Sequence, residues 1–184
     1  MTSPKIPAKV PLFSSTNVQE KGSLEQFLRF YLVPDTTVIL PLTQLTEVLS
    51  IPLGQIIPIP QMPSWIMGVY NWRGEILWMV DLGQLLGLTP WHQQSITSSF
   101  YRAIVLHSMS SEQAPTRVKG QVLGLVVSQV EDIEWCNPQE IQSPPASAIT
   151  PCLAPFLRGY WLKPGGKMMV TLDGEAIMAA LPKP

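Results

Sequence analysis

Short apolar runs separated by turn residues make up the chain from about residue 24 onward. Many of these runs alternate apolar and polar positions, a period of two that predicts strands. Gly, Pro, Asn and Asp gather between the runs, as they do at turns. The runs that predict strands are residues 27–32, 37–40, 46–50, the two arms of a hairpin over 66–80, 103–106, 120–127, 129–135, 157–162 and 167–172.

The hairpin over 66–80 is the most informative of these runs. Its two apolar arms meet at a tight turn, Asn71-Trp72-Arg73-Gly74. Arg73 is a fixed cation beside Trp72 and near Trp78, whose rings offer faces for cation–π contacts. Trp, Tyr and Arg are enriched at the energetic centres of protein interfaces. The turn therefore predicts a surface that binds another protein, and the alternative is a turn arginine that only faces water.

Three short helical segments are expected between the strands. Asp81 is a suitable N-cap for a helix over 81–87, because its carboxylate can accept free backbone N–H groups of the first turn. Gln84 stands where a capping-box partner belongs, and Gly87 suits the left-handed position that ends a helix. Asp173 in the same way predicts a helix over 175–181, and residues 42–45 predict a single turn.

An internal duplication with a period of about 90 residues follows from the order of these elements. Gly68-Val69-Tyr70 corresponds to Gly159-Tyr160-Trp161, and Trp78-Met79-Val80 to Met168-Met169-Val170. Each hairpin precedes an Asp-capped helix. Five short strands per half are enough for a small closed barrel, which removes exposed strand edges. The expected fold class is all-β, mainly β with short helices.

Segments without periodicity surround and interrupt these elements. Residues 1–23 are rich in Pro, Ser, Thr and Lys and predict a flexible tail, so one folded domain is expected over 24–184. Residues 108–119 predict a polar loop, and residues 143–155 a proline-rich connection.

Composition and charge exclude several classes of function. The 184 residues are 46% apolar and 14% charged, with a net charge of -1, which gives no general attraction to nucleic acid or anionic membranes. No run of 18 apolar residues predicts a membrane span, and no signal peptide is recognisable. Cys136 and Cys152 lack the spacing of a metal site, so both are expected to be reduced thiols of a cytoplasmic protein.

Catalytic and cofactor chemistry has no clear candidate residues. His92 and His107 are the two histidines, and no ligand-like spacing surrounds either of them. Glu131, Asp132 and Glu134 form an acidic cluster that strand alternation divides between two faces, and it predicts either a solvated face or a patch toward a partner. The expectation is a protein that is not an enzyme and binds no metal or cofactor. Gly124, inside a strand, predicts a close approach by another backbone or partner, or a bulge.

Several dispersed motifs follow one another in a recognisable order. They are Leu45-Thr46-Glu47-Val48-Leu49, Pro60 and Pro63, Gly68-Val69-Tyr70-Asn71-Trp72-Arg73-Gly74, the strand 75–80, Asp81-Leu82 and Gly124-Leu125-Val126-Val127-Ser128-Gln129-Val130. Together they resemble the CheW family of chemotaxis coupling proteins, and the resemblance extends from about Leu24 to Leu181.

This resemblance implies a single domain over residues 24–184 made of two intertwined SH3-like barrels, five strands each and side by side, and no catalysis. It implies an adaptor that couples the cytoplasmic tip of a chemoreceptor, of the methyl-accepting type, to the regulatory domain of a CheA-type histidine kinase. Such an adaptor is cytoplasmic and reaches membrane-associated arrays through its partners. By position, Asn71 and Arg73 would hold a hairpin turn on which both partners depend. The receptor groove would involve Leu45, Glu47, Ala103, Gly124 and Ile133.

The chain departs from the family pattern at a few positions. Trp78 and Met79 stand where Pro-Val is usual, Ser128 where Asp is common, and Trp135 is unusual. These departures suggest a variant that serves another motility system, such as pilus-driven movement toward light. Two other functions are open: a free-standing module that binds a response regulator or a pilus component, and a nucleic-acid-binding barrel, which the net charge of -1 disfavours.

Overall fold

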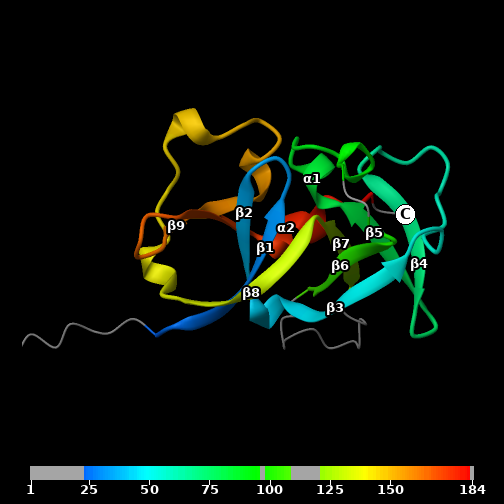
Figure 1. Ribbon diagram of the computed structural model, residues 1–184, viewed down its shortest axis with the longest axis horizontal. Coiled ribbons are helices and arrows are strands. Elements are labelled where there is room, and N and C mark those ends of the chain that lie inside the picture. The colour runs from blue at the N-terminus through cyan, green and yellow to red at the C-terminus, as the bar shows by residue number, and fades with distance from the viewer. Residues whose placement is uncertain (1–22, 96–97, 109–120, 183–184) are drawn as a thin grey trace, which may run out of the picture.

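The computed structural model describes residues 23–95, 98–108 and 121–182 and shows two five-stranded sheets that lie side by side (Figure 1). The expected tail and polar loop fall almost wholly outside the described residues. The α-helices within these ranges are α1 (Leu82–Leu85) and α2 (Gly174–Ala179), and a short 3-10 helix over Leu42–Gln44 confirms the predicted single turn. The strands are β1 (Glu25–Leu32), β2 (Thr36–Pro41), β3 (Leu45–Pro52), β4 (Ile66–Trp72), β5 (Glu75–Asp81), β6 (Phe100–His107), β7 (Val122–Val127), β8 (Gln129–Cys136), β9 (Leu157–Leu162) and β10 (Met168–Leu172).

The ten predicted strands are confirmed, and most extend a residue or two beyond the apolar run that predicted them. One sheet has the order β8-β1-β2-β10-β9 and is called here the first barrel. The other has the order β3-β6-β7-β5-β4 and is called the second barrel. In Figure 1 the first barrel lies on the left and the second on the right.

Each barrel takes strands from both halves of the sequence, so neither barrel consists of the five strands of one half. The first half contributes β1 and β2 to the first barrel and β3, β4 and β5 to the second. The second half contributes β6 and β7 to the second barrel and β8, β9 and β10 to the first. A shift of five strands therefore maps one barrel onto the other, which supports the duplication in a strand-exchanged form.

Two equivalent glycines give the duplication a local signature. The backbone of Ile57 exchanges two hydrogen bonds with Val69, of 2.8 and 2.9 Å, and Gln142 does the same with Tyr160. In both hairpins the preceding residue, Gly68 or Gly159, is a glycine against which the crossing backbone packs. A side chain would block this crossing, so both repeats require glycine there.

The registers correct the predicted alignment of the two hairpins. Gly68 lies opposite Met79 and Gly159 opposite Thr171. Counting to the caps at Asp81 and Asp173 gives the same result. The segment 78–80 therefore corresponds to residues 170–172 and not to 168–170. A shift of two residues preserves the face of a strand, which explains why the sequence pattern looked similar in both alignments.

Three apolar clusters account for the packing. The largest, called here the shared cluster, contains residues of both sheets and of α2, so it lies between the barrels and holds them together. A second cluster fills the second barrel, and a third fills the first barrel around Phe27, Ile39 and Met169. Strands with one face in a barrel and the other in the shared cluster are apolar on both faces, as the continuous runs in β2 and β7 show.

Both predicted caps are confirmed. Asp81 accepts the backbone N–H of Gln84 at 3.0 Å, and Asp173 accepts those of Glu175 and Ala176. Both helices are shorter than predicted: α1 ends at Leu85 and not at residue 87, and α2 ends at Ala179 and not at residue 181. Gly87 has the expected left-handed conformation, with φ of +73°. The second carboxylate oxygen of Asp81 accepts the N–H of Trp91 at 2.7 Å and so fixes the loop beyond the helix.

The two cysteines are expected to differ in reactivity. Burial raises the pKa of the Cys136 thiol from an ordinary 9.0 to about 12, and the nearby Glu140 carboxylate adds to the effect, whereas Cys152 is exposed. Native protein at pH 8 should react with a maleimide at Cys152 only, and both thiols should react in denaturant. With rising pH, the Cys136 thiol ionises near pH 9 in the unfolded chain but only near pH 12 in the folded protein. The contribution of the buried Cys136 to the free energy of unfolding is therefore complete below pH 9 and is lost as the pH rises toward 12. Labelling of native Cys136 at pH 8 would contradict this assignment.

Candidate partner-binding surface

The turn of the β4–β5 hairpin is built from a two-residue loop. Trp72 and Glu75 are the last paired residues, and both central residues, Arg73 and Gly74, have positive φ, of 54° and 83°. This is the pattern of a type I′ turn, whose twist matches that of the flanking strands. Asn71 supports the turn, since its side-chain oxygen accepts the N–H of Gly74 at 3.0 Å. Asn71 thus has the turn-holding contact that its position predicted.

Arg73 belongs to a cluster of three side chains, called here the hairpin cluster. One oxygen of Glu47 accepts the indole N–H of Trp72 at 2.5 Å, and the other lies 3.0 Å from the guanidinium of Arg73. The Arg73 guanidinium carbon lies 5.1 Å from the centre of the Trp72 ring, within cation–π range. Glu47 lies in β3 and Trp72 in β4, the two edge strands of the second barrel. The cluster therefore joins the edges where that barrel closes.

The conformation of Arg73 indicates that its side chain is needed. A left-handed backbone disfavours a residue with a Cβ, and Gly or Asn would be accommodated there with less strain. The Arg73 side chain is 67% exposed, and an ion pair so exposed adds about 0–1 kcal/mol to stability. This gain is too small to explain an arginine at a strained position. A surface role for the guanidinium gives a better account.

The first barrel closes with a related but buried contact, called here the Glu134 cluster. Glu134 in β8 accepts hydrogen bonds from Lys163 at 2.7 and 2.8 Å and from Arg29. Arg29 Nε also lies 2.7 Å from Glu131, an ion pair without hydrogen-bond alignment. Lys163 follows β9, just as Arg73 follows β4. The two clusters occupy equivalent places, but only the hairpin cluster presents an exposed guanidinium beside an indole ring.

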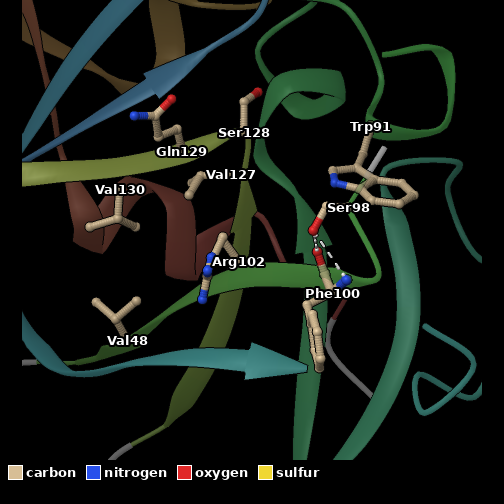
Figure 2. A pocket seen from close by; sticks show the side chains of 9 residues that line it. All are labelled: Val48, Trp91, Ser98, Phe100, Arg102, Val127, Ser128, Gln129 and Val130. Carbon is tan, nitrogen blue, oxygen red and sulfur yellow. Dashed lines mark hydrogen bonds between the residues drawn. The ribbon is translucent and has the colours of Figure 1, made fainter. Parts of the chain in front are cut away.

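A groove of about 490 Å³ lies between the barrels, and Figure 2 shows it from close by. It is called here the inter-barrel groove. In this view Val130 of β8 lies above Val48 of β3, and Arg102 of β6 lies to the right of both. Trp91 and Ser98 border one end, and the side chain of Ser98 bonds the backbone of Phe100. The remaining lining residues are Val127, Ser128 and Gln129.

The five residues predicted for the receptor groove do not share one surface. Ile133 lies in β8 and is 43% exposed. Leu45 is half-buried against the shared cluster, and Glu47 belongs to the hairpin cluster. Ala103 is 0% exposed, with its side chain inside the second barrel, and Gly124 is buried there too. Direct contact with a partner is therefore not expected at Ala103 or Gly124, which corrects that part of the prediction.

Gly124 has a structural reason that the sequence did not reveal. A Cβ at this position would lie 2.5 Å from the sulfur of Met79 and 3.2 Å from a methyl group of Leu77. The glycine thus makes room for the Met79 side chain of the neighbouring strand. Neither a bulge nor an approaching backbone, the two predicted explanations, is the cause.

The residues that do line the groove stand next to predicted ones in the sequence. Val48 follows Glu47, and Arg102 precedes Ala103. Val48 pairs with Ile104 on the face of the shared cluster, whereas Glu47 pairs with Val105 inside the second barrel. Successive strand residues face opposite sides, so an error of one position exchanges the groove for the core. Leu49 and Ile51 pack inside the second barrel, so alternation along the strand from these two apolar residues would have placed Val48 on the other face.

Comparison with known proteins identifies the family. A family model described as the CheW-like domain matches residues 26–181, most of the chain. This chain belongs to the CheW-like family. The resemblance inferred from the dispersed motifs is thereby confirmed.

Two known proteins show how far the likeness extends. The chemotaxis protein CheW of Rhizobium meliloti (strain 1021) is 30% identical over 88 residues, which are 48% of this chain and 48% of that protein. The alignment thus spans about half of that relative. The crystal structure of the scaffolding protein TtCheW from Thermoanaerobacter tengcongensis matches with a TM-score of 0.64 and 24% identity, over 82% of this chain and 90% of that one. This match confirms the prediction of a mainly β fold with SH3-like barrels.

Two further observations concern the described residues only. Neither helix of this CheW-like chain in the described ranges has the length and apolarity needed to cross a bilayer. Within the same ranges, no group of three or more His, Cys, Asp or Glu side chains is placed to hold a metal ion.

Proposed function

We propose that this CheW-like protein is a non-enzymatic adaptor that couples a chemoreceptor-type sensor to a CheA-type histidine kinase. The observation that carries the proposal is the presence of two distinct surfaces on the two faces of one strand. Glu47 of β3 faces the hairpin cluster, and Val48 faces the inter-barrel groove. An adaptor needs two such surfaces on a rigid support. The CheW-like family assignment and the scaffolding role named for TtCheW support this proposal.

The hairpin cluster is the proposed contact for the regulatory domain of the kinase. Arg73 and Trp72 are residue types that dominate interface energies. Ile76 and Ile57, on the same hairpin and on the segment that crosses it, are strongly exposed apolar residues that would extend the contact. The charge of Arg73 then supplies orientation, and the apolar neighbours supply buried area.

The inter-barrel groove is the proposed contact for the cytoplasmic tip of the receptor. Its lining includes apolar residues from both barrels, such as Val48 of β3 and Val130 of β8, and Ile133 is an exposed apolar residue on the same strand as Val130. The motility system in this proposal is the pilus-driven one that Trp78, Met79 and Ser128 suggested. The location is the cytoplasm, at receptor arrays.

Charge reversal at Arg73 tests the kinase contact. Arg73→Glu places a carboxylate beside Glu47 and removes the cation over Trp72, so affinity for the kinase regulatory domain should fall by at least tenfold. Isothermal titration calorimetry against that purified domain measures the loss, and circular dichroism should remain unchanged because the side chain is exposed.

The matched control is Arg158→Glu, which makes the same charge change on an exposed arginine at the start of β9. This control should bind normally. Normal binding by Arg73→Glu would show that the contact lies elsewhere. Pull-down with the wild-type chain from cell extract separates the adaptor from the alternative, since recovery of a response regulator or pilus component without kinase and receptor would favour a free-standing regulatory module.

A further inference from the structure

A second hollow lies between the barrels, with a volume of about 180 Å³, and is called here the Val170 hollow. It shares no lining residue with the inter-barrel groove. Val170 of β10 and Tyr160 of β9 line it from the first barrel, and Leu86 and Leu88 line it from the segment that ends α1. Leu153 of the proline-rich connection completes the apolar lining. All five side chains belong to the shared cluster or pack against it, so the hollow is a gap in the apolar core between the barrels.

The proline-rich connection forms one wall of this hollow. A Cβ at Gly87 would lie 2.9 Å from the Cβ of Cys152, so the connection is in close contact with the end of α1. Gly87 stands between the lining residues Leu86 and Leu88, and Cys152 precedes the lining residue Leu153. A molecule in the hollow would therefore contact the first barrel, the segment that follows the second barrel's β5 and the connection at the same time.

The lining of the Val170 hollow selects an uncharged ligand. Its other two described residues are Thr36 and Thr150, and none of the seven is charged. Leu86 and Val170 are buried whereas Thr150 is exposed, so the floor is apolar and a hydroxyl lies toward the mouth. Burial also raises the pKa of the Tyr160 phenol, as expected where little water reaches the ring. A charged group would lose its hydration here without gaining a partner of opposite charge.

The internal duplication indicates the shape of that ligand. Tyr160 lies opposite Val170 in the β9–β10 hairpin, and Val69 lies opposite Trp78 in the β4–β5 hairpin. With the corrected alignment of the two hairpins, Trp78 is therefore the counterpart of Val170. Trp78 packs against the shared cluster from the second barrel, as Val170 does from the first. One repeat places an indole ring here, and the other places only an isopropyl group.

The neighbours of Val170 compensate for the missing ring only in part. Leu86 and Met178 are each the fifth residue after a capping aspartate, and both are buried in the shared cluster, so the two helical segments contribute side chains of similar size. Tyr160 is larger than its counterpart Val69 and takes some of the space. The remaining volume of about 180 Å³ exceeds that of an apolar cavity of about 150 Å³ that is known to bind benzene.

We propose that the Val170 hollow binds one uncharged, flat aromatic molecule of one or two rings, in the place that corresponds to the Trp78 ring of the second barrel. This site is separate from both adaptor surfaces, since neither the hairpin cluster nor the groove contributes to its lining. The ligand would complete the packing between the two barrels and the connection. Its binding should therefore raise the thermal unfolding temperature of the folded chain.

Indole is the probe that tests this site, because it is the ring of the Trp78 side chain. Calorimetry with the purified full chain should give a dissociation constant of about 1 mM or lower. In methyl ¹H–¹³C spectra, indole should shift the signals of Leu86, Leu153 and Val170 and leave that of Val48 in the inter-barrel groove unchanged. Indole-3-acetate, which carries a carboxylate, should bind about tenfold more weakly or not at all.

Variants that fill the hollow should lose the indole site. Val170→Trp supplies the missing ring from the chain itself and should lower the affinity for indole about tenfold or more. Leu53→Trp is the matched control, because it adds the same ring at an exposed apolar position of the second barrel, and it should bind indole like the wild type. Leu153→Phe fills the hollow from the connection and gives the same test if Val170→Trp does not fold.

The wild-type spectra alone can overturn the proposal. Unchanged methyl signals of Leu86, Leu153 and Val170 at indole concentrations near its solubility limit would show that the hollow binds no such ring. Shifts confined to other residues would show the same. Normal indole binding by a folded Val170→Trp or Leu153→Phe variant would place the ligand elsewhere, and equal affinity for indole-3-acetate would contradict the selection of an uncharged ligand.

Discussion

Replacing Gly68 by alanine is expected to lower the free energy of unfolding by about 3 kcal/mol or more. A Cβ at this position would lie 2.1 Å from the carbonyl oxygen of Ile57 and 2.6 Å from its carbon. Both are backbone atoms held by the two hydrogen bonds between Ile57 and Val69, so they cannot move aside without breaking that crossing. The φ of +136° adds backbone strain for any residue with a side chain.

Alanine substitutions at two other glycines allow the cost of the steric clash and the cost of the backbone strain at Gly68 to be measured separately. Gly54 has φ of +88° with nothing within 4 Å of a Cβ, so Gly54→Ala carries the strain alone, about 1 kcal/mol. Gly159 has no positive φ, but its Cβ would lie 2.6 Å from Gln142 O, so Gly159→Ala carries a clash alone. Urea unfolding should rank the losses as Gly68, then Gly159, then Gly54. Equal losses at Gly68 and Gly54 would show that the crossing segment yields easily.

The local elements were predictable because their causes are local. Alternation of apolar residues gave the strands, and aspartate followed by a short apolar segment gave both caps. The turn was predicted over Asn71-Trp72-Arg73-Gly74, and the structure places its two central residues at Arg73 and Gly74. Each of these signals acts within about four residues, so the sequence contains the whole cause.

The exchange of strands between barrels was not predictable in the same way. Whether β3 pairs with β6 or with a strand of its own half depends on contacts about 55 residues apart along the chain, and both pairings bury similar apolar faces. The duplication itself obscures the answer, since equivalent strands have similar patterns. The family resemblance supplied two barrels, and only the structure shows which strands each contains.

Which face of its strand each predicted groove residue occupies depends on a more local feature. Bulges interrupt β3 between Leu45 and Glu47 and β8 near Glu131, and each changes which residues face outward. Carrying over positions from the family placed Glu47 and Ala103 in the groove, where the structure has Val48 and Arg102. The resemblance named residues on strands that line the inter-barrel groove, and the bulges that change the outward face of β3 and β8 are not visible in the sequence pattern.

The Glu134 cluster is expected to contribute more to the free energy of unfolding than the hairpin cluster, and glutamine substitutions should reveal the difference. Glu134 is buried and accepts hydrogen bonds from Arg29 and Lys163. Glu134→Gln removes the charge that compensates these cations and turns an amide N–H₂ toward them. The loss should be about 2 kcal/mol, since hydrogen bonds to charged groups contribute about 1.5–3 kcal/mol and part of the loss is recovered by Lys163, which can reach water.

Glu47→Gln is the matched variant at the equivalent closure, and its loss should be below about 1 kcal/mol. Its partner Arg73 is mostly exposed, so solvent screens the pair, and the amide oxygen can still accept the indole N–H of Trp72. Urea unfolding of both variants measures the difference. Equal losses would mean that the hairpin cluster holds the second barrel closed and that Arg73 is retained for stability. A large loss at Glu134 with a small one at Glu47 would leave the exposed cluster available for a partner, because the second barrel then stays closed without it.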